Sequence, residues 1–280
     1  MSGGARRVVV TGASSGIGEA CALRLARRGW HVFAGVRRDE DGERLQAGGG
    51  GRIEPLRIDV TDSASIAAAA DALGEAPLDG LVNNAGIAVA LPIEFVPLDE
   101  LRRQLEVNVV GQVAVTQAFL EPLRRARGRI VNVGSIAGRS SLPFLGAYAA
   151  SKHALEALTD ALRIELAPFG IGVAIVEPGS IATPIWRKGA ETFQRLAADL
   201  PPEATSLYGQ RMAAFREAAT AAGRRGEPAD TVAKVVEHAL TATRPRTRYL
   251  VGRDARLRAA FEHLPDRVRD RVYERVLLKG

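Results

Sequence analysis

Seven short apolar runs rich in β-branched residues recur along this chain of 280 residues, and segments with helical periodicity separate them. Runs of this length and composition predict buried strands, and strands that alternate with helices predict a parallel sheet covered by helices on both faces. We therefore expect an α/β fold with a doubly wound sheet of the Rossmann type, its strand order left open. The predicted strands are residues 7–11, 31–36, 52–58, 80–83, 129–133, 173–177 and 249–251.

No linker or internal repeat divides the chain, so the sequence predicts one domain over residues 1–280. Residues 184–226 depart from the alternation, because they lack a strand signal but place apolar side chains on helical faces. We expect two short helices here that cover the carboxyl ends of the strands, where open α/β sheets bind ligands. The other predicted helices are residues 19–28, 63–73, 98–127 and 151–168.

The formal net charge of +6 is concentrated in a basic C-terminal extension, residues 244–280. This extension holds eleven Lys or Arg against five Asp or Glu, and the rest of the chain holds 27 of each. The main body therefore has no basic field, and we expect no nucleic-acid partner. Apolar residues at helical spacing predict an amphipathic helix that docks on a partner subunit or on the cover, with a membrane surface as the alternative. They are Leu257, Phe261, Leu264, Val268, Val272, Val276 and Leu277.

The sequence holds one cysteine and four scattered histidines. Cys21 lies in a helical stretch and is predicted to be a core residue, and no histidine has Cys or acidic partners at ligand spacing, so we expect no metal site. No run reaches the ~18 to 20 apolar residues of a membrane span, and the first residues lack the apolar core of a signal peptide. We expect a soluble cytoplasmic protein.

The first predicted strand runs into a glycine-rich turn and then a helix, in the sequence Thr-Gly-Ala-Ser-Ser-Gly-Ile-Gly at 11–18. Without Cβ atoms, such a turn lets a pyrophosphate approach the free N–H groups of the helix, where the helix dipole also favours negative charge. A plain strand-to-helix turn is the alternative, and the position between strand and helix favours a dinucleotide site. The expected contacts are Gly12, Ser14, Ser15, Gly16, Ile17 and Gly18.

The second predicted strand ends Phe-Ala-Gly-Val-Arg-Arg at 33–38, where a dinucleotide-binding fold meets the adenosine ribose. An acidic residue there would bind a free 2′-hydroxyl and repel a 2′-phosphate, but Val36 occupies that position and Arg37 follows it. A guanidinium grips a phosphate through two charge-assisted hydrogen bonds. The sequence therefore favours NADP(H) over NAD(H), with a solvated surface arginine as the alternative.

Tyr148 and Lys152 lie four residues apart in a helical stretch, and hence on one helix face. Hydride transfer to a carbonyl leaves an alkoxide, and a tyrosine can protonate it if the tyrosine pKa falls from ~10 toward neutrality. The Lys152 ammonium, with an oxidised nicotinamide, would favour the phenolate. The Ser135 hydroxyl, thirteen residues before Tyr148, can hydrogen-bond the substrate oxygen where charge develops. This pattern predicts the interconversion of an alcohol and a carbonyl compound.

Five motifs match, in order and spacing, those of the short-chain dehydrogenase/reductase family, and the resemblance spans almost the whole chain. They are the glycine turn at 11–18, Asn-Asn-Ala-Gly at 83–86, Asn108, Ser135 and Tyr-Ala-Ala-Ser-Lys at 148–152. Arg-Tyr-Leu-Val-Gly at 248–252 resembles the retinol and hydroxysteroid dehydrogenase branch. The resemblance implies that Ser135 orients the substrate and that Asn108 holds a proton-relay water to Lys152, with a purely structural role of Asn108 as the alternative.

The same resemblance implies further cofactor contacts and a homodimer or homotetramer with 98–127 and 148–168 as contact helices. Asp59 and Val60 would meet the adenine, and Thr183 would bond the nicotinamide carboxamide. Turn chemistry alone is the alternative for the contacts that follow the third and fourth strands. The remaining expected contacts are Asn84, Ala85, Gly86, Asn108, Tyr148, Lys152, Pro178, Gly179 and Ile181.

Three apolar stretches are expected around the reactive carbon: 89–93, 142–145 and the start of the cover at Ile185 and Trp186. They predict a hydrophobic alcohol or ketone as substrate, unless they only pack the cover against the sheet. A non-catalytic NADPH-binding regulator is the alternative function. Such a binder needs no proton donor, so the joint presence of four residues favours an enzyme. They are Asn108, Ser135, Tyr148 and Lys152.

Overall fold

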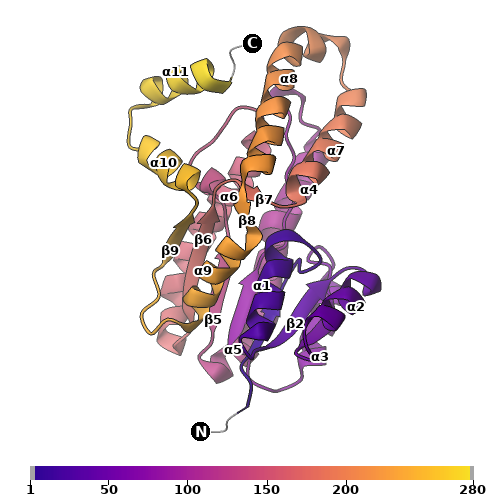
Figure 1. The fold of residues 1–280 in the computed structure, drawn as a ribbon, viewed down its shortest axis with the longest axis vertical. Coiled ribbons are helices and arrows are strands. Elements are labelled where there is room, and N and C mark those ends of the chain that lie inside the picture. The colour runs from indigo at the N-terminus through magenta and orange to yellow at the C-terminus, as the bar shows by residue number, and fades with distance from the viewer. Residues whose placement is uncertain (1–3, 278–280) are drawn as a thin grey trace.

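Seven parallel strands form the central sheet of the computed structural model, which describes residues 4–277 of the chain (Figure 1). Every predicted strand is present, to within a few residues at its ends. The order along the sheet is β3-β2-β1-β4-β5-β6-β9. The chain adds β2 and β3 on one side of β1 and the later strands on the other side, as in a doubly wound fold. The strands are β1 Arg7–Val10, β2 His31–Val36, β3 Ile53–Arg57, β4 Gly80–Asn83, β5 Arg129–Val133, β6 Gly172–Pro178 and β9 Arg248–Val251.

Helices cover both faces of this sheet, because successive strand residues point to opposite sides. In β1, Val8 and Val10 pack on the side of α1, α2 and α9, whereas Val9 packs on the side of α3, α5 and α6. The predicted core residue Cys21 is fully buried on the first side. The helices are α1 Gly16–Arg27, α2 Asp39–Gly48, α3 Ser63–Leu73, α4 Leu98–Leu105, α5 Gly111–Ala126, α6 Gly146–Leu166 and α9 Ala229–Thr241.

The predicted helix 98–127 is interrupted by a π-helical turn, Glu106–Val110, between α4 and α5. Asn108 lies fully buried inside this turn, where its side chain binds the backbone of Ile87. A Cβ on Gly111 would lie 2.4 Å from the Val60 oxygen, so the helix resumes at a close approach to the end of the β3 segment. The interruption therefore reflects tertiary contacts that periodicity does not record.

The cover consists of α7 Ile185–Ala198 and α8 Pro202–Arg225, which rise from the carboxyl edge of the sheet (Figure 1). The expectation of two short helices is wrong for α8, which runs for 24 residues. A two-stranded pair, β7 Ile181–Ala182 with β8 Glu227–Pro228, joins the two ends of the cover. The predicted apolar faces pack against one another and against Val89, Leu91 and Phe144.

The C-terminal extension forms two helices, α10 Arg253–Phe261 and α11 Asp266–Leu277, instead of the single helix predicted. Pro265 prevents one continuous helix, since it lacks an N–H donor and its ring would clash with the carbonyl of Phe261, where α10 ends. α11 lies against α8 of the cover, one of the two predicted docking targets. Leu257, Leu264 and Val268 are exposed, so this part of the predicted apolar face does not dock within the chain. The side chains of Val276 and Leu277 lie outside the described residues.

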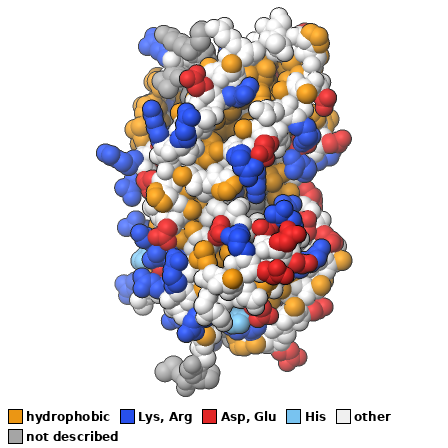
Figure 2. Space-filling model, turned by 45° about the vertical axis from the view of Figure 1, so that its right-hand side comes forward, with side chains coloured by type: hydrophobic (Ala, Val, Ile, Leu, Met, Phe, Trp, Pro, Cys, Tyr) orange, Lys and Arg blue, Asp and Glu red, His pale blue; other side chains and the backbone are white. Residues whose placement is uncertain are grey.

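The surface carries its charges unevenly. Figure 2 shows Lys and Arg side chains along the left border of the view and a mixture of both signs at the lower right. Within residues 4–277, none of the helices combines the length and apolarity that crossing a bilayer requires.

Candidate active site

The residues predicted to form the site gather along the carboxyl edge of the sheet, although they come from segments far apart in the chain. Parallel strands all end at the same edge, so the segments that follow them meet there. The glycine turn follows β1, Asn84 follows β4, Ser135 follows β5, and the loop 178–183 follows β6. In Figure 1 this edge faces upward, toward α7 and α8.

Tyr148 and Lys152 lie on successive turns of α6, with the Lys152 Nζ 5.9 Å from the centre of the Tyr148 ring. Burial raises the pKa of Tyr148 above its ordinary value, and the Ser135 hydroxyl and the charge of Arg258 lower it. The net effect of the protein's own groups is therefore a raised pKa. Arg258, a residue of α10, is a cation at this site that the sequence did not suggest, and the effect of Lys152 on the phenol stays a prediction.

Lys152 is almost completely buried, and its Nζ donates a hydrogen bond to the Val133 oxygen at 2.9 Å. Burial lowers the pKa of Lys152 to about 8, while the nearby Glu156 carboxyl raises it. Lys152 therefore remains mostly protonated at neutral pH and can give up its proton with little cost in free energy.

Two buried carboxyl groups lie beneath Lys152. Burial, and then the charge of Glu177, raise the pKa of Glu156 to about 7, and burial also raises that of Glu177. Arg248 pairs with both carboxyl groups, and Arg139 pairs with Glu177 at 3.5 Å. Sequence reasoning missed this cluster, and the spacing of Lys152 and Glu156 by four residues was the available signal.

Ser135 caps the 3-10 turn Ile136–Gly138 directly after β5, and its Oγ accepts the Ala137 N–H at 3.1 Å. That contact uses an oxygen lone pair and leaves the hydroxyl proton available. The Ser135 hydroxyl is also close enough to the Tyr148 phenol to lower its pKa. The structure thus brings together three of the four predicted catalytic side chains.

Asn108 has its amide engaged by other protein groups. Its Oδ1 accepts the Ile87 N–H at 2.9 Å, and its Nδ2 donates to the Ile87 oxygen and to the Ser151 Oγ, both at 3.0 Å. The Ser151 hydroxyl in turn donates to the backbone carbonyl oxygen of Tyr148 at 2.7 Å. These contacts support the structural alternative, in which Asn108 positions the turn that carries Tyr148, and the relay role stays a prediction.

The glycine turn has the backbone conformation that glycine allows. Gly12 and Gly16 have φ of 63° and 62°, in the left-handed region that other residues avoid. A Cβ on Gly18 would lie 2.3 Å from the Gly12 oxygen. The Asn84 Nδ2 binds the Thr11 and Gly12 oxygens at 3.0 and 3.2 Å, which ties this turn to β4.

The start of α1 fits a pyrophosphate. Ser15 is extended and makes no side-chain cap, so the first N–H groups of the helix lack a capping acceptor from it. Lys188 of α7 lies with its Nζ 3.4 Å from the Ser15 Oγ, and thus adds a cation that the sequence did not suggest. The backbone oxygen of Ser14 accepts a hydrogen bond from Arg44, a second such cation, at 2.7 Å. Ile17 packs into the core.

Arg37 is exposed directly after β2, and its charge helps to lower the pKa of Asp59, although Asp59 burial opposes this. The Asp59 carboxylate accepts the N–H and the hydroxyl of Thr61 at 3.0 and 2.8 Å. Val60 is buried beside it. The structure therefore brings Arg37 and Asp59 together at the end of the sheet where an adenosine is expected.

Ala85 and Gly86 continue the Asn84 segment toward the helix that carries Asn108. The Ala85 N–H donates to the Thr11 hydroxyl at 3.1 Å. A Cβ on Gly86 would approach the Asn108 Oδ1 at 3.3 Å. This segment therefore connects the glycine turn to the buried asparagine.

The loop after β6 is held by the C-terminal extension. The Gly179 N–H donates to the Val251 oxygen at 2.9 Å, and the Ser180 N–H donates to the Asp254 carboxylate at 2.7 Å. Ile181 is buried, and Thr183 lies against Gly16, whose added Cβ would sit 3.1 Å from the Thr183 Cβ. Pro178 ends β6, and the loop thus closes beside the glycine turn.

The apolar stretches expected around a substrate largely pack the cover. Val89, Leu91 and Phe144 are buried against α7 and α8, as the alternative interpretation held. The Trp186 Nε1 donates to the Ile181 oxygen at 2.7 Å, and a Cβ on Gly223 of α8 would collide with the Trp186 ring at 2.8 Å.

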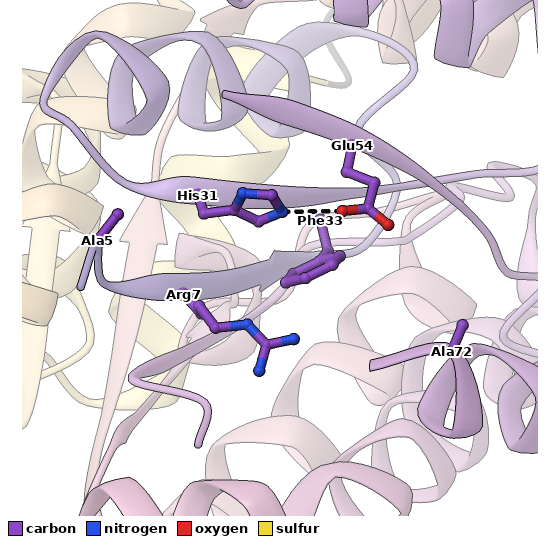
Figure 3. A pocket seen from close by; sticks show the side chains of 6 residues that line it. All are labelled: Ala5, Arg7, His31, Phe33, Glu54 and Ala72. Carbon is purple, nitrogen blue, oxygen red and sulfur yellow. Dashed lines mark hydrogen bonds and ion pairs between the residues drawn. The ribbon is translucent and has the colours of Figure 1, made fainter. Parts of the chain in front are cut away.

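A surface hollow of ≈ 410 Å³ lies at the opposite end of the sheet (Figure 3). It adjoins the first residues of β1 and β2, where His31 pairs with Glu54 at 2.9 Å and the Arg7 guanidinium lies 4.9 Å from the Phe33 ring. None of the residues predicted for the site lines it. The open amino edge of a parallel sheet is not where such folds bind cofactors, so we do not assign this hollow to the reaction.

Comparison with known proteins identifies relatives that are oxidoreductases. Residues 6–193 match the family model described as short chain dehydrogenase. An "NADPH-dependent 3-dehydrocapnine reductase" of Ornithobacterium rhinotracheale is 36% identical over 98% of both chains. "Retinol dehydrogenase 5" of Mus musculus is 39% identical over 96% of this chain and 88% of its own.

A solved structure has the same fold over the whole chain. It is a short-chain dehydrogenase from Burkholderia cenocepacia in complex with NADP, with a TM-score of 0.74, 28% identity and full coverage of both chains. The likeness therefore includes the cover and the C-terminal extension as well as the sheet.

Proposed function

The chain belongs to the short-chain dehydrogenase/reductase family, in its retinol and hydroxysteroid dehydrogenase branch, and we propose that it interconverts a ketone and a secondary alcohol, or an aldehyde and a primary alcohol, with NADP(H). The observation that carries this proposal is the meeting of the Tyr148 phenol with the Ser135 hydroxyl and the Lys152 ammonium at the carboxyl edge. These are a proton donor, a hydrogen-bond donor and a cation, which the reduction of a carbonyl requires.

Tyr148 gives its proton to the oxygen of the reduced carbonyl, while Ser135 donates a hydrogen bond to the same oxygen. Burial holds the Tyr148 phenol in its neutral form, since it raises the phenol pKa. Loss of the phenol proton therefore costs free energy unless positive charges lie close to the ring. Lys152 stands 5.9 Å from that ring and supplies one such charge.

Asn108 acts here as a positioning residue. Its side chain holds Ser151, and Ser151 holds the backbone of Tyr148. The contact fixes the turn of α6 on which the phenol is carried. A neighbouring π-helical turn of this kind is frequent at functional sites.

The residues at the glycine turn fit a dinucleotide, because two left-handed glycines and an uncapped helix start leave N–H donors directed outward. When bound, NADP(H) supplies the hydride. Arg37 is free to hold a 2′-phosphate, since within residues 4–275 no carboxylate lies within 4.0 Å of its guanidinium. A relative described as NADPH-dependent and a neighbour solved with NADP support this choice.

A hydrophobic alcohol or carbonyl compound is the proposed substrate. Ile93 is strongly exposed, and Leu142, Leu145 and Ile185 are partly exposed near the end of the sheet that holds Tyr148. These side chains remain available after the cover has buried its own apolar face. They offer an apolar surface to a ligand.

The test is NADPH oxidation against a panel of hydrophobic and small polar ketones. We expect turnover of hydrophobic ketones, and a loss of at least about a thousandfold in kcat/KM for Tyr148→Phe with NADPH affinity unchanged. Tyr249→Phe serves as the matched control, because Tyr249 lies in β9 and bonds only the Arg246 N–H among the described residues. Equal activity of Tyr148→Phe and the wild type would refute the mechanism. Turnover of small polar ketones alone would refute the substrate class.

A further inference from the structure

A partly buried guanidinium from the C-terminal extension binds the segment that follows Ser135. Arg258 of α10 directs its hydrogen bonds to Ser140, with Nη2 2.9 Å from the Ser140 oxygen and Nε 3.3 Å from its Oγ. Its charge reaches the Tyr148 phenol and lowers the phenol pKa. Arg258 therefore stands within electrostatic range of the reacting oxygen.

The position of Arg258 is fixed by packing on the segment that begins with Ser135. Ala255 and Ala259 of α10 are buried against Ile136, the residue after Ser135. The Ser140 Oγ that receives Arg258 also lies 3.0 Å from the Tyr273 hydroxyl of α11. Both helices of the extension thus hold the guanidinium in one place, which lowers the entropy lost when a ligand binds it.

Arg258 has no carboxylate partner within residues 4–275, where no acidic oxygen lies within 4.0 Å of it. The two nearest acids are otherwise engaged: Asp254 accepts the Ser180 N–H, and Glu262 pairs with Arg269. Burial lowers the pKa of Arg258, and Tyr273, Asp254 and Glu262 oppose this from beyond ion-pair distance. By contrast, Arg248 has three carboxylates around it.

A partly buried cation that lacks an ion-pair partner is stabilised when a ligand supplies a negative charge next to it. We propose that Arg258 determines specificity by binding an anionic group of the substrate, a carboxylate, sulfonate or phosphate, close to the carbon that reacts at Tyr148. This inference rests on the proposed function and narrows its substrate class. The substrate is then amphipathic, with its acid on Arg258 and its apolar part against the 142–145 segment and the cover.

The alternative is that Arg258 acts only through Tyr148, as a positioning residue. Loss of Arg258 would then lower the turnover of neutral and acidic ketones equally. Loss of an anion site lowers only that of the acidic ones. A pair of substrates that differ in this charge alone therefore separates the two roles.

The first measurement is calorimetric binding of decanoate and of decanol to the NADPH complex, in which neither ligand can react. We expect decanoate to bind about tenfold more tightly than decanol, since a hydrogen bond to a charged group contributes roughly 1.5 to 3 kcal/mol. Arg258→Gln should remove this difference and leave decanol unchanged, and Arg258→Lys should keep part of it. Arg256→Gln is the matched control, because Arg256 is exposed on the same helix.

The second measurement compares kcat/KM for a medium-chain γ-keto carboxylate and its methyl ester. Arg258→Gln should lower the value for the carboxylate about tenfold more than the value for the ester, because a loss that acts through the Tyr148 pKa is common to both ketones. Equal binding of decanoate and decanol to the wild type overturns the proposal, and so does an equal loss with both ketones. If the wild type turns over neither ketone but still prefers decanoate, the proposed function is contradicted and the anion site is not. Tyr148→Phe, which should lack turnover, should keep the preference for decanoate.

Discussion

The two sides of the candidate site are built in different ways. On the cofactor side, the glycine turn after β1 is held by Asn84 at the end of the neighbouring strand β4, and its own backbone makes the site. On the substrate side, where the nicotinamide end of the cofactor is also expected, side chains of α10 hold the loops. Asp254 binds Ser180, 74 residues earlier, and Arg258 binds Ser140, 118 residues earlier.

This difference explains why one side is readable from motifs and the other is not. A turn that exposes backbone N–H groups to a phosphate requires a few residue types in a fixed order. A short motif in the sequence therefore identifies this site. A loop held by a distant side chain needs one carboxylate or guanidinium at the right place in space. Nothing in the local sequence marks that residue.

The largest expected effect comes from breaking the backbone side. In Gly18→Ala the new Cβ would meet the Gly12 oxygen at 2.3 Å and the Asn84 Nδ2 at 2.5 Å. We expect NADPH to bind about a hundredfold more weakly and the free energy of unfolding to fall by about 2 kcal/mol, from overpacking. NADPH fluorescence titration and urea unfolding measure both.

Gly209→Ala in α8 is the matched control for that change. The nearest atom to its new Cβ is the Thr205 Cγ2 at 3.3 Å, at the end of an exposed side chain. We expect NADPH affinity to be unchanged and the free energy of unfolding to rise by up to about 1 kcal/mol, from helix propensity. Equal losses in the two variants would remove the contrast between the sides.

The next effect comes from releasing the loop on the substrate side. Asp254→Ala removes the acceptor of the Ser180 N–H and opens space beside Gly179. We expect kcat/KM for a ketone to fall about thirtyfold, while the Kd of NADPH changes less than about threefold, since one charged hydrogen bond contributes roughly 2 kcal/mol. Asp266→Ala, an exposed acid of α11 paired with Arg269, should change neither. A parallel loss of NADPH binding would show that the two sides are one unit.

A smaller effect tests the cofactor side at the end where the adenosine is expected. We expect the wild type to bind NADPH at least about tenfold more tightly than NADH, and Arg37→Ala to remove the difference, because a bidentate contact to the 2′-phosphate is lost. Arg38→Ala should keep the preference, since Arg38 is engaged by Asp41 at 3.0 Å. Equal dissociation constants of the two cofactors in the wild type would contradict the assignment of Arg37.

The smallest effect concerns the two buried carboxyl groups of Glu156 in α6 and Glu177 in β6. The pKa of Glu156 is raised to about 7 in the fold, so the folded state binds a proton that the unfolded state releases near its ordinary pKa. Stability from this proton is present in full below that ordinary pKa and is lost as pH rises through about 7. We expect the wild type to lose about 1 kcal/mol of unfolding free energy on this rise.

Glu156→Gln should lack this loss, because an amide keeps the geometry without titrating. Urea unfolding at about pH 5.5 and about pH 8.5 compares the variants. Glu165→Gln, an exposed residue of the same helix, is the control and should behave as the wild type. A pH dependence retained in Glu156→Gln would assign it to another group.

Much of the fold followed from periodicity, and the misses have physical reasons. The seven strands were predicted because β-branched runs buried on both faces have few alternatives. The π-helical turn at Asn108 was missed, since it depends on hydrogen bonds to Ile87 that lie 21 residues away in the chain. The length of α8 and the break at Pro265 were also missed, because amphipathic spacing does not fix where helices end.

The predicted site divides in the same way. The sequence brought forward Tyr148, Lys152 and Ser135, and the structure gathers these three side chains. It did not indicate Lys188, Asp254 or Arg258, which reach the site from the cover and the extension. A lone Lys or Arg in a basic segment resembles its solvated neighbours until its surroundings are known.

The sequence by itself determined the doubly wound sheet, the glycine turn and the residues that carry the proton chemistry, because these depend on local backbone geometry and on spacing along one helix. Only the tertiary structure decided which charges surround Tyr148. Burial and long-range packing set the pKa of a phenol, and both depend on residues such as Arg258 that lie more than a hundred positions away.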